Sequence, residues 1–371
     1  MGAAAIIRSE RDETAALHES STKVNYPDLD TVKLLMAFLV VEIHTRPLEA
    51  LDIPERIVEG IDVVAVPFFF IASAFLCFRG LSEADFSDSS SCASIRVRKT
   101  AFKLLELYLI WTALYLPITI FGDLLYGKDL LHGLLAFVRQ TLFVGENFCS
   151  WPLWYLLAGF VAFALVYCCL RSGMAQNRVV GLSFLFLLAG YFIMVVAEWS
   201  DAPRAIAIPV GIYEKLFVNT RNGLFEGFFY VALGAFFGTK HERFEAMPFV
   251  YLLIGLIFGV VGCIFINANA HLPFCACAGT CLFLLSIKRC GPDLLPHVGM
   301  RNASTIIYLV HMMFAVVFVY GICGGVNPDI HANNADRLLL YLFSLGGSAL
   351  LSAVVIQLSK KSPLTKRIFG I

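Results

Sequence analysis

The chain has 371 residues, of which 58% are hydrophobic and 15% are charged, and its formal net charge is zero. A soluble domain carries about 25% charged residues, so this composition excludes an ordinary soluble domain and indicates an integral membrane protein. Nucleic-acid binding needs a clustered basic surface, and a neutral apolar chain gives no support for it. We therefore predict a lipid bilayer as a partner and no nucleic acid.

The polar segment 1–27 lacks the apolar stretch and small-residue cleavage site of a secretory signal peptide. The first apolar segment is therefore expected to serve as the insertion signal and to be retained. A membrane-spanning helix needs about 20 mostly apolar residues. Ten segments meet this need and predict an all-α integral membrane protein: 31–48, 61–80, 101–121, 152–171, 179–198, 222–239, 248–267, 271–288, 302–322 and 338–359.

The distribution of Lys and Arg between these segments predicts the orientation. Cytoplasmic loops are enriched in Lys and Arg. If the N-terminus lies inside, more than twice as many Lys and Arg fall on the inner side as on the outer side. Both termini are therefore predicted to be cytoplasmic. The predicted organisation is an N-terminal tail (1–30), one ten-span membrane domain (31–359) and a C-terminal tail (360–371).

The first predicted span contains three ionisable residues, Lys33, Glu42 and His44. Lys33 and His44 lie only about 20° apart around a helix and about 16 Å apart along it, with Asp30 close to the same face, whereas Glu42 points almost opposite to His44. Ionisable groups inside a span are costly and mark pathways or sites. Taken singly, Lys33 could also snorkel to the interface, and His44 and Glu42 could make ordinary polar contacts there.

The stretch D-T-V-K-L-L-M-A-F-L-V-V-E-I-H (30–44) resembles the acyltransferase 3 family of membrane acyltransferases. The first helix of that family typically carries Asp, then a basic residue, usually Arg, and then His; here the basic residue is Lys33. VPFFFIASAF (66–75) resembles the family's aromatic stretch ending in Ser-Gly-Phe, with Ser73 in the serine position and Ala74 in place of Gly. The resemblance extends over nearly the whole chain through SIRVRKTAFKLLELYLIWTALY, WPLWYLLAGF, TRNGLFEGFFYVALGAFFG and STIIYLVHMMF.

This resemblance implies a donor site for acyl-CoA, by default acetyl-CoA, at the predicted cytoplasmic surface. Asp30, Lys33, Arg96 and Arg98 are its candidate residues, since phosphate groups need cationic partners and Arg suits them well. Arg96 and Arg98 could also reflect membrane topology alone. Lys33 keeps the charge of the usual Arg but loses its planar fork.

The resemblance places the catalytic residue, His44, near the opposite surface. It could deprotonate an acceptor hydroxyl or carry the acyl group transiently. The candidates for lining the pore or the acceptor side are Ser73, Glu146, Trp154, Arg221, Asn222, Tyr308 and His311. Ser304, Tyr308 and His311 share one helical stripe. Some of these residues could instead tie helices together or belong to an interfacial aromatic belt.

The predicted function is transfer of an acyl group from cytoplasmic acyl-CoA to a hydroxyl of an extracytoplasmic acceptor, in a bacterial cytoplasmic membrane. A polysaccharide, peptidoglycan, a lipid-linked sugar and a small molecule all remain open as acceptors. The alternatives are a secondary transporter or flippase, and a non-catalytic sensory domain of the same fold. The eleven cysteines lack paired C-x2-C spacing, so no metal site is predicted.

Overall fold

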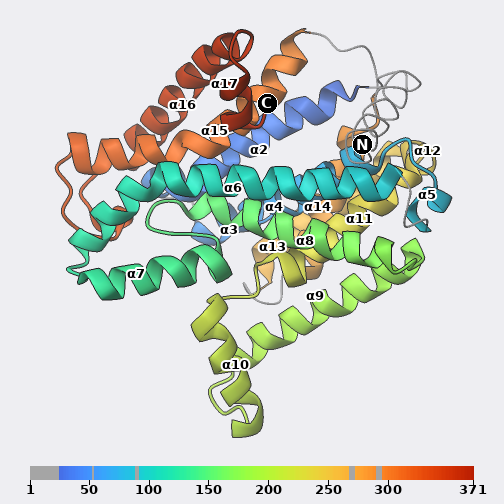
Figure 1. The fold of residues 1–371 in the computed structure, drawn as a ribbon, viewed down its shortest axis with the longest axis horizontal. Helices are drawn as coiled ribbons and strands as arrows, with labels where there is room; N and C mark the ends of the chain where they lie inside the picture. Colours follow the sequence, from blue (N-terminus) through green and yellow to red (C-terminus); the bar gives the residue numbers. More distant parts are fainter. Residues whose placement is uncertain (1–24, 52–53, 88–91, 267–271, 290–294) are drawn as a thin grey trace, which may run out of the picture.

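The computed structural model describes residues 25–51, 54–87, 92–266, 272–289 and 295–371. Most of the predicted N-terminal tail (1–24) therefore lies outside the described residues. Regular secondary structure in the described part is helical throughout, as expected for an all-α protein. Most of the long helices lie side by side along the long axis of the molecule, and α10 projects away from them at the bottom of the view (Figure 1).

Each predicted span falls largely on helix; residues 267 and 271, at the ends of two of the spans, lie outside the described residues. The corresponding elements are α2 (Pro27–Thr45), α3 (Glu55–Asp62) with α4 (Ala65–Phe78), α6 (Cys92–Leu125), α8 (Trp154–Arg171), α9 (Gln176–Glu198), η4 (Gly223–Gly227) with α11 (Phe228–Thr239), α13 (Phe249–Phe265), α14 (Leu272–Ser286), α15 (Leu295–Val316) with η5 (Val317–Ile322), and α16 (Arg337–Ser359). Shorter or peripheral elements are η1 (Pro47–Leu51), α5 (Glu83–Ser87), α7 (Leu130–Arg139), η2 (Gln140–Val144), η3 (Trp151–Leu153), α10 (Arg204–Phe217), α12 (His241–Glu245), η6 (Ile330–Ala332) and α17 (Pro363–Phe369).

Six helical stretches of the described chain are long and apolar enough to cross a bilayer. They are Arg56–Phe78, Cys92–Leu125, Trp151–Arg171, Gln176–Glu198, Pro296–Ile322 and Arg337–Ser359. This finding agrees with a multi-pass membrane protein. The count of ten spans and the cytoplasmic placement of both ends stay predictions.

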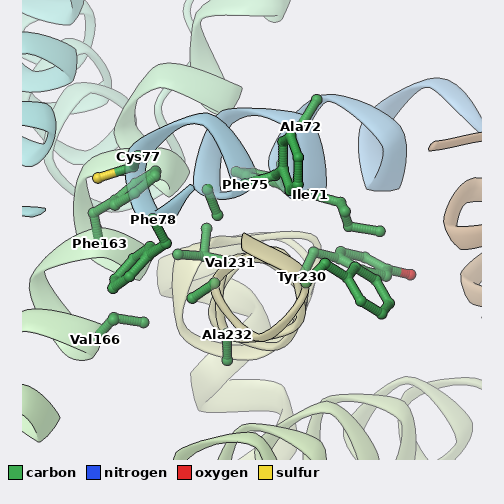
Figure 2. Packing of buried hydrophobic residues seen from close by; sticks show 14 of the residues in the cluster. Ile71, Ala72, Phe75, Cys77, Phe78, Phe163, Val166, Tyr230, Val231 and Ala232 are labelled. Atoms are coloured by element: carbon green, nitrogen blue, oxygen red, sulfur yellow. The ribbon is translucent and has the colours of Figure 1, made fainter. Parts of the chain in front are cut away.

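Helices α4 and α11 pack closely against each other in the core. Gly234 and Gly238 form a G-x-x-x-G pattern on α11, and this pattern lets two helix backbones approach closely. A Cβ atom on Gly234 would lie 2.4 Å from the carbonyl oxygen of Ile71, and one on Gly238 would lie 2.9 Å from the Cβ of Phe78. Figure 2 shows the side chains of α4 packed over those of α11 in this contact.

Helix α2 lies between two groups of helices: it packs against α15 and α16, and also against α3, α4 and α14. Pro27 occupies its first turn, where the missing backbone N–H is not needed. Its other end is closed by Arg46, which has φ 52° and donates its backbone N–H to the Glu42 carbonyl at 2.8 Å. Residues 30 and 44 are thereby fixed near opposite ends of one continuous helix.

Candidate functional site

The Asp30 end of α2 is organised by an ion pair with α15. The Arg301 side chain donates to both carboxylate oxygens of Asp30, from Nε to Oδ1 at 3.0 Å and from Nη2 to Oδ2 at 2.7 Å. Asp30 is 3% exposed, so this is a bidentate pair around a buried carboxylate, the strongest arrangement for these groups. Arg301 was not among the predicted site residues. Its position seven residues before Tyr308, on the same helical stripe, was the available signal.

Lys33 lies one turn further along α2 and is half-buried. The structure gives its ammonium group no hydrogen bond or ion pair with any described residue, because Arg301 occupies the Asp30 carboxylate instead. A lysine placed in this way keeps its three donors for an incoming anion.

Arg96 and Arg98 project from different faces of α6, because residues two apart lie about 200° from each other around a helix. Arg96 donates to the Arg79 carbonyl at 3.2 Å, and the Arg79 guanidinium lies 5.7 Å from the ring centre of Tyr26, directly before α2. Arg98 is exposed and lines a shallow surface groove with Lys99 and Lys103. The structure thus links Arg96 to the Asp30 end of α2 and leaves Arg98 apart from it.

Polar side chains continue from this end toward the middle of the bundle. The Ser73 hydroxyl lies 3.2 Å from the hydroxyl of Tyr155, whose ring contacts the Tyr308 ring with centroids 6.0 Å apart. The Tyr308 hydroxyl donates to the Pro152 carbonyl, and Ser304 donates to the Arg301 carbonyl at 2.8 Å. The predicted stripe on α15 therefore faces the bundle interior, and each of these hydroxyls is engaged.

At its other end, α2 contributes His44 to a stack of four rings. The His44 ring lies 5.5 Å from the ring of His311, almost parallel at 23°, and 5.8 Å from the ring of Trp151. Trp151 in turn stacks on His331 of η6, with centroids 6.3 Å apart and planes at 22°. We call His44, His311, Trp151 and His331 the histidine stack. His311 was predicted to line the pore, whereas Trp151 and His331 were not among the predicted site residues.

Hydrogen bonds fix the proton positions at two members of the stack. Nδ1 of His311 lies 3.0 Å from the Ile307 carbonyl, which accepts only from N–H, so Nδ1 carries the proton and Nε2 is left as a buried lone pair with no partner among the described residues. Nδ1 of His331 lies 3.0 Å from an Arg337 Nη1 donor. Burial, with Arg337 and Arg46 nearby, lowers the pKa of His331 to about 4, so its ring is neutral at neutral pH.

This arrangement suits a general base. A neutral imidazole accepts a proton from a hydroxyl at a pH where the hydroxyl itself stays protonated. Two stacked imidazoles repel each other if both are charged, so the His44–His311 pair accommodates one added proton far more readily than two. The stack can therefore take one proton during a reaction and return it.

The family model for the acyltransferase domain matches residues 26–357, which includes both ends of this site. The chain belongs to the acyltransferase 3 family. The chain is also similar to an amino-acid racemase of Enterococcus faecalis, at 24% identity over 63% of this chain and 31% of the relative. A serine/alanine racemase of Enterococcus gallinarum is 28% identical over 62% of this chain and 32% of the relative. The chain thus spans about a third of the length of these curated relatives, and no solved structure matches it.

The remaining predicted residues of this acyltransferase family member lie outside the histidine stack. Trp154 packs edge-on against Phe70 in the core, with ring centroids 6.4 Å apart. Asn222 caps η4, since its Oδ1 accepts from the backbone N–H groups of Leu224 and Phe225 at 3.0 and 3.3 Å. Burial raises the pKa of Glu146, and the nearby Arg221 opposes that rise.

A cavity of about 790 Å³ lies on the other side of α2 from the histidine stack. Glu42, Asp62 and Arg221 are among its lining residues, and His44 is not. Glu42 therefore points away from His44, as the helix geometry predicts. The only predicted acceptor-side residue in the cavity wall is Arg221.

Proposed function

We propose that this member of the acyltransferase 3 family moves an acyl group from acyl-CoA, bound at the Asp30 end of α2, to an acceptor hydroxyl at the His44 end. One observation carries the proposal: α2 and α15 meet twice, through Asp30 and Arg301 at one end and through His44 and His311 at the other. The same two helices therefore combine a cationic end suited to phosphates with a histidine end suited to proton transfer.

Donor binding rests on the cations at the first end. Lys33 and Arg96 are available for the phosphate groups of coenzyme A, while Arg301, held by Asp30, fixes the shape of the site. The thioester arm would then extend along α2 past Ser73, Tyr155 and Tyr308. The direction of transfer, from inside to outside, follows from the predicted orientation of the chain.

At the second end, His44 acts on the acceptor. As a base it takes the hydroxyl proton while the oxygen attacks the thioester carbonyl; collapse of the tetrahedral intermediate breaks the carbon–sulfur bond, and the imidazolium returns its proton to the departing thiolate. As an acyl carrier its ring nitrogen would attack the thioester carbonyl and expel the thiolate; the hydroxyl would then attack the acyl-imidazole, the acyl–nitrogen bond would break, and the hydroxyl proton would pass to the thiolate. A trapped acyl-His44 adduct would distinguish the second route from the first.

The acceptor classes proposed from the sequence are surface glycans, lipid-linked sugars and small molecules. The names of the two relatives add a specific small-molecule class, because one is a racemase of serine and alanine and serine carries a hydroxyl. Transport of a small amino acid is the second candidate function, favoured by the charged cavity beside α2, and the relatives' names supply only the class of small molecule.

The test uses the purified chain in sealed vesicles, with labelled acetyl-CoA on one side and glycan, ethanolamine or serine acceptors on the other. Removing a general base costs about 10²–10⁴-fold in rate, so His44→Ala should lose transfer to that extent. His132→Ala is the matched control, because the His132 side chain is 75% exposed on α7 and is not a member of the stack. A His44→Ala protein that inserts normally and transfers at the full rate would overturn the proposal. Serine uptake without any acyl-CoA would favour transport.

A further inference from the structure

Five carboxyl side chains, none used in the proposed acyl transfer, line the cavity beside α2: Glu42, Glu49, Glu59, Asp62 and Glu226. Of these, Glu42 and Asp62 have buried oxygens without a hydrogen-bond partner among the described residues. Glu42 comes from α2 and Asp62 from the end of α3, and the two groups lie next to each other. Cys275, another lining residue, donates to the Val63 carbonyl at 3.0 Å and is therefore engaged. The Glu42–Asp62 pair is the part of the wall whose buried oxygens lack a partner among the described residues.

Glu42 is only 7% exposed, and neither of its carboxylate oxygens has a hydrogen-bond donor among the described residues. Oδ1 of Asp62 is buried and unpartnered in the same way. Three acceptor oxygens therefore lie buried in the side chains of the cavity wall, without a hydrogen-bond donor among the described residues. Burying a charge or a polar group without compensation costs several kcal/mol as an order of magnitude, so a group of this kind in a span points to a binding site.

Several partners could compensate the pair, and they differ in how completely they do so. A proton shared between the two carboxyls satisfies at most part of the three oxygens. Within the described residues no group of three His, Cys, Asp or Glu side chains could hold a metal ion, which argues against a metal ligand set here. A neutral hydroxyl brings one donor and no charge. A primary ammonium brings three donors and a positive charge, which matches three unpartnered oxygens.

We propose that this cavity is a binding site for a small organic molecule, and that it recognises a primary ammonium group through Glu42 and Asp62. Three arginines, Arg46, Arg56 and Arg221, line the same cavity and favour an additional anionic group on the ligand. The site is distinct from the histidine stack, because Glu42 and His44 project from opposite faces of α2. It stands on its own, whether or not the chain transfers acyl groups.

Three matched probes test the recognised group: L-serine, which has an ammonium and a carboxylate; ethanolamine, which lacks the carboxylate; and L-glycerate, which has a hydroxyl in place of the ammonium. Binding is measured by calorimetry on the full chain in lipid nanodiscs. We expect L-serine to bind most tightly, ethanolamine to bind more weakly and L-glycerate not to bind. Absence of binding by both amines would overturn the proposal, and so would binding of L-glycerate equal to that of L-serine.

Substitutions of single residues test whether the ligand binds at Glu42. Glu42→Gln keeps the size of the side chain but removes its charge, so it should weaken L-serine binding at least about tenfold, the loss of a single charged hydrogen-bond partner. Glu214→Gln, on the exposed surface of α10, is the matched control and should bind as the original protein does. Equal binding by Glu42→Gln would overturn the site.

Discussion

Two buried carboxylates on the same helix have opposite surroundings. Asp30 and Glu42 both belong to α2 and are 3% and 7% exposed. Asp30 receives two charged hydrogen bonds from Arg301, whereas both oxygens of Glu42 are without a donor among the described residues. They differ because α15 places a guanidinium opposite Asp30, and the elements around Glu42 leave a cavity instead.

This difference separates a carboxylate that positions its neighbour from one that is available to a ligand. A buried carboxylate that is fully hydrogen-bonded contributes to a fixed arrangement, and removing its partner is costly. An unpartnered one is already costly in the folded protein, and a bound ligand can recover that cost. Substitutions that break the Asp30–Arg301 pair should therefore disturb folding, whereas a substitution of Glu42 should disturb ligand binding alone.

The largest effect on stability is expected from Arg301→Met. This change leaves the Asp30 carboxylate buried and unpaired, and breaking a buried ion pair in this way costs about 3–5 kcal/mol. Asp30→Asn should cost less, because the Arg301 side chain is 38% exposed and water can solvate it after the loss of its partner. Denaturant unfolding of the purified protein in detergent measures both. Equal losses of unfolding free energy in Arg301→Met and Asp30→Asn would contradict this expected difference.

The next effect is on the proposed activity and concerns His311→Phe. Phenylalanine keeps a ring beside His44 but removes the Nδ1 donor and the Nε2 lone pair, so we treat His311 as a positioning residue for His44. Misplacing a reacting group by about 1 Å costs about 10²-fold, and we expect a loss of that order in kcat with little change in KM. A purely structural role would leave the shape of the pH–rate profile unchanged; we expect the profile to move.

Geometry within α2 could be predicted from the sequence. The helical period alone places Lys33 and His44 on one face and turns Glu42 away, and the structure agrees with that placement. The same rule could have separated Arg96 from Arg98, since residues two apart cannot share a helix face. All ten predicted spans fall largely on helix because long apolar segments are a strong and local signal.

Contacts between distant segments could not be predicted in this way. Arg301 meets Asp30 across 271 positions of sequence, and no local pattern in a single chain specifies that pair. Trp151 reaches His44 from η3, and His331 of η6 stacks on Trp151; both elements are short and lie in segments that carry no helical periodicity. The cavity likewise depends on how α2, α3 and α14 pack, so Glu42 could be identified as unusual but its surroundings could not.

A smaller effect is expected at the far end of the histidine stack, where His331 has an engaged nitrogen. The folded-state pKa of His331 is about 4, below its ordinary value of 6.5. Between pH 4 and pH 6.5 the unfolded chain binds a proton at His331 and the folded chain does not. The neutral His331 therefore contributes fully to the free energy of unfolding above about pH 6.5, and this contribution is lost as the pH falls toward 4. His331→Asn retains an acceptor for Arg337 without titrating. Its melting temperature should therefore fall by a few degrees less than that of the original protein between pH 7 and pH 5; an identical fall in both proteins would contradict this.

The smallest effect on stability is expected from Glu42→Gln, and it is the sharpest test of the comparison. Glutamine removes the buried charge, and no ion pair is lost, because no described cationic side chain is paired with Glu42. The free energy of unfolding should therefore be unchanged or rise by about 1 kcal/mol, in contrast to the loss in Arg301→Met. Denaturant unfolding without ligand measures this directly. A destabilisation of about 3 kcal/mol, the scale of a broken buried ion pair, would mean that Glu42 has a structural partner and that its carboxylate is equivalent to that of Asp30.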